Sequence, residues 1–301
     1  MSDAALTIDV ELFEHTPAYR AASGTTSRDG IGLAGLEFLR DALDRADATA
    51  TCFVVSDVAV RHPAAVRSLA DAGHEIGSHT HTHRLLGDLD PSERDEEMMR
   101  SKEILENTVE PSIRGFRAPA FEFGPDHFHA LAAAGYEYDA SVVASRSIPG
   151  WYGGEYSLQR PAPATAVDPS APPHLVELPT SVMPGLRLPL TGFWLRLFGP
   201  RYTIMGMRLL ARRGIAPVLY VHPWEFVDLP AVEGVPRRVT VRTGPWMRRA
   251  VERILEQPFE FRTLQAIRAD AGVGESTPDR SNDESAGETA GSAETNTHGG
   301  A

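Results

Sequence analysis

Alternating strand and helix patterns constrain the fold more than any other feature of this sequence. Apolar runs of strand length predict strands near residues 4–10, 50–55, 75–76, 113–117, 136–139, 175–178 and 217–222. Segments with apolar residues at helical spacing or with helix start and stop signals lie between them, near residues 32–46, 63–72, 91–108, 126–134 and 202–213. This alternation is typical of parallel sheets. The number of units predicts an α/β fold, a distorted (β/α) barrel of about seven parallel strands.

Two stretches interrupt the alternation. Residues 153–173 are rich in proline, alanine and glycine, which predicts a long loop over one end of the barrel. Residues 272–301 are small and polar with an excess of acidic side chains, and such a segment buries too little apolar surface to offset the cost of ordering. We therefore expect one barrel domain over residues 1–271, with residues 229–271 as an extension packed on it, followed by a disordered acidic tail.

The overall charge and the single cysteine narrow the class of protein. A formal net charge of -12 argues against a nucleic-acid-binding surface and against adhesion to anionic lipid. Cys52 lies in an apolar run, which predicts a buried structural thiol. The sequence shows neither a signal-peptide pattern nor an apolar run of membrane-spanning length. These features predict no stable membrane insertion and a cytoplasmic location. Activity at the inner face of the membrane is an alternative within that location.

Four histidines stand within residues 74–83, directly after a predicted strand. His79 and His83 are separated by three residues, which puts both imidazoles on one face of a helical turn or of an extended segment. His81 shares that face only if the segment is extended. Two imidazoles placed in this way can share one metal ion, and a metal site also needs an anionic ligand.

Ionisable residues also follow other predicted strands, at the end of a β/α barrel where chemistry collects. Asp9 and Glu11 end the first strand, and because successive side chains alternate, both point the same way. Arg117, Asp139 and His222 end three later strands. Each has a structural alternative, as a surface ion pair, a turn cap or a satisfied core histidine respectively.

Other histidines and aromatic residues have simpler interpretations. Three histidines sit beside helices or loops and are expected to be structural: His74, His127 and His129. Five large aromatic residues could stack on sugar rings but belong more often to a core: Trp151, Tyr152, Phe193, Trp194 and Trp224.

Taken in order, these motifs resemble those of the NodB-like polysaccharide deacetylases, the carbohydrate esterase family 4 type. The matching segments are T-I-D-V-E at 7–11, H-T-H-T-H at 79–83, R-A-P-A-F at 117–121, D-A-S at 139–141 and L-Y-V-H at 219–222. The resemblance covers about residues 4–228, and five ordered matches are more specific than any single motif. The D-x-E pattern of the first motif and H-P-W-E-F at 222–226 resemble a branch found with exopolysaccharide and glycan assembly systems.

The resemblance implies a metal-dependent hydrolase of amide, not peptide, bonds. Its substrate would be an N-acetylated amino sugar in a polysaccharide, glycolipid or glycan precursor, from which it would remove the acetyl group. His79 and His83 would bind a divalent metal, zinc before others. Glu11 would be the third ligand, since Val10 stands where many members have a second aspartate.

The resemblance also implies the catalytic roles. Asp9 would be the general base that accepts a proton from the attacking water, oriented by Arg117. His222 would be the general acid that protonates the leaving amine, held in its charged form by Asp139. Two alternatives stay open on the same fold. One is a hydrolase of small cyclic amides, as in allantoinase-like and imidase-like relatives, and the other is a glycan-binding barrel without turnover.

Overall fold

The computed structural model describes residues 1–22, 30–110, 112–148 and 154–273. Seven parallel strands run through one strongly curled sheet in the order β7-β5-β4-β3-β2-β1-β8. They are β1 (Ser2–Val10), β2 (Thr51–Val54), β3 (Glu75–Ser78), β4 (Gly115–Phe116), β5 (Tyr138–Asp139), β7 (Val176–Glu177) and β8 (Val218–Val221). This confirms the predicted distorted barrel of about seven parallel strands.

Two further strands complete the sheet. β6 (Ala162–Pro163) pairs with β7 in the antiparallel direction, and β9 (Phe259–Phe261) pairs with the first residues of β1. Between β7 and β8 the ladder is interrupted, and residues 180–191 cross this gap with single bridges such as Thr191 to Tyr220. The sheet therefore curls almost round on itself without a continuous seam.

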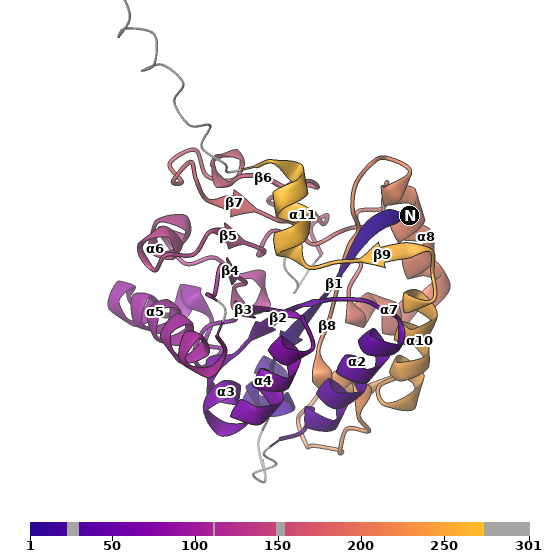
Figure 1. Cartoon of the computed structure of the whole chain (residues 1–301). Coiled ribbons are helices and arrows are strands. Elements are labelled where there is room, and N and C mark those ends of the chain that lie inside the picture. The colour runs from indigo at the N-terminus through magenta and orange to yellow at the C-terminus, as the bar shows by residue number, and fades with distance from the viewer. Residues whose placement is uncertain (23–29, 111, 149–153, 274–301) are drawn as a thin grey trace, which may run out of the picture.

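Helices cover the outside of the curled sheet (Figure 1). They are α1 (Pro17–Arg20), α2 (Leu33–Arg45), α3 (Ser56–Arg61), α4 (Pro63–Asp71), α5 (Pro91–Thr108), α6 (His127–Ala133), α7 (Gly192–Phe198), α8 (Pro200–Ala211), α9 (Arg237–Thr240), α10 (Pro245–Leu255) and α11 (Leu264–Ala271). α5 has the predicted bounds because Asp90 and Glu93 form a capping box around Pro91 at its first turn. No helix in the described ranges is long and apolar enough to cross a membrane.

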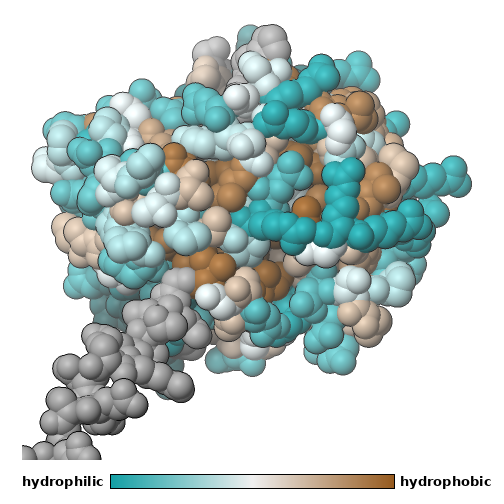
Figure 2. Space-filling model, turned by 90° about the horizontal axis from the view of Figure 1, so that it is seen from above, coloured by the Kyte–Doolittle hydropathy of each residue, from teal (hydrophilic) through white to brown (hydrophobic). Residues whose placement is uncertain are grey.

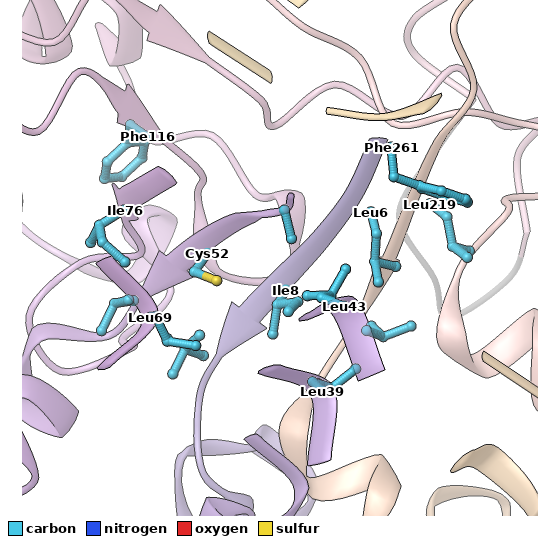
Figure 3. Close-up of a cluster of buried hydrophobic side chains, with 14 of the residues drawn as sticks. Leu6, Ile8, Leu39, Leu43, Cys52, Leu69, Ile76, Phe116, Leu219 and Phe261 are labelled. Carbon is cyan, nitrogen blue, oxygen red and sulfur yellow. The ribbon is translucent and has the colours of Figure 1, made fainter. Parts of the chain in front are cut away.

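Alternation along the strands divides the core into two layers. Leu6 and Ile8 of β1 face outward and pack against Leu39 and Leu43 of α2 (Figure 3). Cys52 lies in this outer layer, where burial raises the pKa of its thiol. The inner layer contains Ala5, Phe53, Tyr138 and Val218. Leu264 and Ile267 of α11 pack against it at the amino ends of the strands, where Leu264 N–H donates to Thr51 Oγ1 at the start of β2. The carboxyl ends of the strands are thus left for polar side chains.

Residues beyond the last large strand pack on the sheet. α10 contacts α2 and α8, while β9 extends the sheet beside the start of β1. In the region predicted as a long loop, residues 154–173 contain β6 and one short 3-10 helix. The predicted acidic tail lies, from residue 274, outside the described residues. On the face drawn in Figure 2, apolar residues form several separate groups among polar ones.

Candidate metal centre and active site

A pocket of about 920 Å³ opens at the carboxyl ends of the strands. Five of the predicted site residues line it: Asp9, Glu11, His79, His83 and His222. All but His222 are less than a tenth exposed, which is unusual for ionisable groups without a shared function. The topology brings these side chains together from β1, from the loop after β3 and from the end of β8.

Asp9 is held by an arginine buried inside the barrel. Arg117 Nη1 donates to Asp9 Oδ1 over 2.6 Å and to Thr7 Oγ1 over 2.8 Å. The guanidinium is fully buried and lies 4.3 Å from the centre of the Phe53 ring. The predicted pairing of Arg117 with Asp9 is confirmed. A buried, hydrogen-bonded arginine fixes the carboxylate in one orientation and keeps its second oxygen turned to the pocket.

The histidine loop adopts neither of the regular structures from which the spacing was interpreted. Thr80 and His83 have positive φ angles of 63° and 59°. Glu97 of α5 accepts hydrogen bonds from the main-chain N–H groups of His81 and Thr82, both at 2.8 Å. This anchoring overcomes the strain of left-handed backbone at two non-glycine residues. The ring of His81 is not part of the ligand group and contacts Ser56 Oγ at 2.9 Å.

Glu11, His79 and His83 form the one group of potential metal ligands found among the described residues. One ligand atom of each lies within 4.8 Å of the others, and all three residues are buried. His79 Nδ1 contacts the carbonyl of Arg117 at 2.7 Å, which assigns the proton to Nδ1 and leaves a lone pair on Nε2. Burial lowers the pKa of His79 to about 4, so the ring is neutral at pH 7.

The carboxylate of Glu11 is suited to the same ion. Burial alone would raise its pKa, but the neighbouring imidazoles, His83 foremost, outweigh burial and hold the pKa of Glu11 well below its usual range. Its Oε2 lies 2.7 Å from His83 Nε2, yet among the described residues this oxygen has no hydrogen bond of acceptable geometry. Two imidazoles and one ionised carboxylate, buried and close together, fit a divalent metal.

His222 takes its partner from its own loop. Its Nδ1 lies 3.3 Å from Glu225 Oε2, which also accepts the His222 main-chain N–H at 2.9 Å. Arg196 Nε donates to the other oxygen of Glu225 at 2.8 Å. Burial alone would lower the pKa of His222, but the hydrogen bond with Glu225 and the charge of Glu11 outweigh it, so the pKa is raised. The imidazole is therefore prepared to carry a proton.

The expected contact between Asp139 and His222 is wrong. Asp139 instead contacts His127 Nε2 at 3.0 Å and accepts from Ser141 Oγ at 2.6 Å. Tyr138 occupies the barrel interior, so alternation directs Asp139 outward toward α6. There it lies beside Glu177, whose pKa is raised well above its usual range by burial and by the charge of Asp139.

Sequence reasoning missed three residues that hold this site together. Glu225 and Arg196 support His222, and Glu97 supports the histidine loop. The signal for Glu225 was its place three residues after His222, since a glutamate there can accept the main-chain N–H at the start of a helical turn. Arg196 and Glu97 lie on helices outside the motifs and gave no such signal.

The aromatic residues divide between pocket and core. Trp224 lines the pocket, stacks on His222 with ring centres 4.9 Å apart, and donates Nε1 to Glu11 Oε1 at 3.0 Å. Phe193 also lines the pocket, whereas Trp194 is buried outside it. Trp151 and Tyr152 lie outside the described residues.

The fold and the site define a β/α barrel protein with a candidate metal centre. The sequence profile of the polysaccharide deacetylases matches residues 35–138, and that of a domain of unknown function, DUF3473, matches residues 141–269. The first half of the chain is therefore similar to the polysaccharide deacetylase family, and the second half is similar to the DUF3473 segment.

Individual relatives show the same similarity. A peptidoglycan-N-acetylglucosamine deacetylase of Bacillus cereus is 28% identical over 103 residues, which is 34% of this chain and 38% of the relative. The match thus spans little more than a third of either protein. A Mycobacterium smegmatis structure assigned to the polysaccharide deacetylases shares 25% identity over 90% of this chain and 89% of its own, with a TM-score of 0.61. Puue allantoinase has the same fold, at 17% identity, 89% and 88% coverage and a TM-score of 0.59.

Proposed function

We propose that the protein is a metal-dependent hydrolase that removes the acetyl group from an N-acetylated amino sugar in a polysaccharide, glycolipid or glycan precursor. One observation carries the proposal. The Glu11, His79 and His83 set, the Asp9–Arg117 pair and the His222–Glu225 pair all meet at one pocket. Amide hydrolysis needs a polarised carbonyl, a base for water and an acid for the leaving amine, and these three groups match those needs.

Glu11, His79 and His83 would hold the metal, and their two nitrogens and one oxygen favour zinc. When bound, such an ion polarises a carbonyl and lowers the pKa of water. Trp224 restricts Glu11 by donating a hydrogen bond to its Oε1. Oε2 accepts no hydrogen bond from a described residue and would be the oxygen that binds the metal.

Asp9 would accept the proton of the attacking water. It lines the pocket, and its Oδ2 is 3.9 Å from His79 Nε2, so the base lies next to the metal ligands without joining their set. Arg117 occupies Oδ1 over 2.6 Å and so prevents the carboxylate from rotating. Water entering the pocket would therefore meet Oδ2 of Asp9.

His222 would protonate the leaving amine. Its Nε2 lies 3.5 Å from Glu11 Oε1, whereas Asp9 lies nearest to His79, and its Nδ1 is held by Glu225. A base and an acid next to two different members of one ligand set are suited to proton transfer through a tetrahedral intermediate. A protein that only binds glycan would not need this arrangement.

The size of the pocket favours a sugar over a small ureide. A volume of about 920 Å³ accommodates more than one small ring, and aromatic residues such as Phe193 and Trp224 on its wall suit the apolar faces of sugars. A hydrolase of small cyclic amides would have the same fold, so only an assay with both kinds of substrate distinguishes the two functions.

The test combines metal content with product release. Purified protein would be analysed for metal by mass spectrometry, and acetate release from N-acetylglucosamine oligomers measured with and without chelator. We expect about one zinc per chain and chelator-sensitive acetate release. If the protein binds zinc and hydrolyses a ureide but releases no acetate, the substrate is a small cyclic amide and not an N-acetylated sugar. Protein that binds no zinc would refute the metal mechanism.

A further inference from the structure

The outer side of α7 and α8 exposes a group of large apolar side chains. Leu197 and Phe198 at the end of α7 are 48% and 49% exposed, Met205 on α8 is 51% exposed and Val241 after α9 is 40% exposed. We call these four residues the apolar shoulder. Single exposed apolar residues are common on proteins, so the significance of the shoulder depends on whether the four are contiguous.

Contacts between the elements show that they are. Arg242 Nη1 donates to two main-chain carbonyls in the last turn of α7, which places its neighbour Val241 against that turn. The ring of Phe198 lies 4.9 Å from the ring of Tyr202 on α8. Met205 follows Tyr202 by three residues, on the same side of the helix. The shoulder is therefore one surface.

The shoulder is surrounded by arginines. Residues 187–253 contain twelve arginines and four acidic residues, although the whole chain has a net charge of -12. Arg201, Arg237, Arg238 and Arg242 are exposed around the shoulder, and within the described ranges none of them forms an ion pair with a carboxylate. Charges beyond about 10 Å are screened at physiological salt, so this local excess, and not the net charge, governs what binds here.

The shoulder adjoins the mouth of the pocket. Phe193, at the start of α7, lines the pocket, and Arg238 and Val239 of α9 line it as well. α7 therefore has one end in the pocket wall and the other in the shoulder. α3 and α5 lie on another side of the sheet (Figure 1).

The charge of this surface decides between occupants. A second copy of the chain would bring two sets of unpaired arginines face to face across a twofold axis, and like charges across an interface repel. An anionic bilayer accepts both features, because apolar side chains enter the boundary of headgroups and acyl chains while arginines bind lipid phosphates.

We propose that the apolar shoulder and its arginines dock the protein on an anionic membrane surface. Docking in this way buries side chains without inserting a helix, in agreement with the absence of a membrane-spanning helix from the described residues. It also holds the pocket mouth beside the bilayer. That the pocket then meets a lipid-linked glycan rests on the proposed function, whereas the docking itself does not.

Vesicle sedimentation of the full chain tests the proposal without any enzyme assay. Vesicles of phosphatidylcholine alone are compared with vesicles that also contain phosphatidylglycerol, at low and high salt. We expect binding to the anionic vesicles alone, weakening as salt rises. The double variant Arg201→Ala with Arg237→Ala should lower the partition coefficient roughly 25-fold, at about fivefold for each arginine. Arg67→Ala with Arg100→Ala removes two exposed arginines elsewhere and should leave binding unchanged.

A second pair of variants tests the apolar part. Leu197→Ser with Met205→Ser should lower the partition coefficient roughly tenfold. The matched control is Val60→Ser with Met99→Ser, since these residues are 57% and 52% exposed on α3 and α5. Melting temperatures of all variants should match that of the parent chain.

Three results would overturn the proposal. The parent chain could fail to bind anionic vesicles, or the shoulder variants and their controls could lose binding equally. Binding that appears only after removal of residues 274–301 would mean that the acidic tail, and not lipid, occupies the shoulder.

Discussion

Replacing Glu225 with glutamine gives the sharpest test of how the site is built. The carboxylate is fully buried, and it accepts from Arg196 at 2.8 Å through one oxygen and from the His222 main-chain N–H at 2.9 Å through the other. A glutamine can keep only one of these hydrogen bonds, because its NH₂ group must face either Arg196 or the N–H of His222. In either orientation the NH₂ group of the glutamine faces another buried hydrogen-bond donor, either Arg196 Nε or the main-chain N–H of His222.

The expected loss of stability follows from this geometry. The variant leaves the buried Arg196 cation without its carboxylate, since Glu225 is its one acidic partner among the described residues. Removing one partner of a buried ion pair costs about 3–5 kcal/mol. For a chain of this size the melting temperature should fall by roughly 10 °C. A native stability of about 5–15 kcal/mol leaves the variant folded at low temperature in most of that range.

Activity should change as well, and the direction in which its pH profile shifts tests the role of Glu225. Because the pKa of His222 is raised by Glu225 and Glu11 against burial, its acid form should persist to higher pH, and activity should fall as pH rises through that raised pKa. In Glu225→Gln this alkaline limb should move to lower pH, and kcat near neutral pH should fall by about 10²–10⁴-fold. The stability that the raised pKa contributes is likewise present below the unfolded pKa and lost as pH rises through the folded one.

Asp139→Asn is the matched control. It also removes a buried carboxylate, but one that contacts His127 and Ser141 instead of His222. We expect it to alter the melting temperature and leave the alkaline limb of the rate profile in place. A shift of that limb in Asp139→Asn, with none in Glu225→Gln, would refute the assignment of Glu225 as the residue that positions His222.

Other predictions concern the metal, the base and the core. His79→Ala should weaken zinc binding by at least about tenfold in equilibrium dialysis, whereas His81→Ala should bind like the parent chain, since its ring contacts Ser56. Equal zinc affinities would remove His79 from the ligand set. Asp9→Asn should keep its zinc and lose about 10²–10⁴-fold in kcat, and an unchanged rate would exclude Asp9 as the base. Gly115→Ala should lower the free energy of unfolding in urea by about 1–3 kcal/mol, because its Cβ would lie 2.2 Å from the Tyr138 ring; no change would show that the ring can move away.

The parts of the site that the sequence predicted correctly depend on local rules. Asp9, in β1, and Glu11, directly after its end, line the same pocket, as the alternation of side chains along an extended segment predicts. Arg117 reaches Asp9 because both follow strands whose carboxyl ends meet at one end of the barrel. The rules place these residues at one end of the barrel without knowledge of which strands are neighbours, whereas the pairing of Arg117 with Asp9 came from the family resemblance.

The predictions that failed depend on contacts with elements that are not adjacent in the sequence. Asp139 could be placed only by knowing that Tyr138 occupies the barrel interior, which depends on how β5 pairs with β4 and β7. The histidine loop was interpreted through regular periodicities, but anchoring by Glu97 gives it left-handed residues that no spacing rule contains. β9 and the helices near it were missed because their short apolar runs follow a region without strong periodicity.

The two matched profiles do not correspond to two independent folding units. The polysaccharide deacetylase segment supplies His79, His83 and Arg117, and the DUF3473 segment supplies His222 and its partners. Asp9 and Glu11 precede both segments. β8 pairs with β1, and β7 pairs with β5, so the sheet itself crosses the boundary near residue 140. A cut at that boundary would separate the candidate metal ligands from His222 and would expose the edges of β1 and β5. The segment of unknown function is therefore the second half of this barrel, and the site is complete only when both halves fold together.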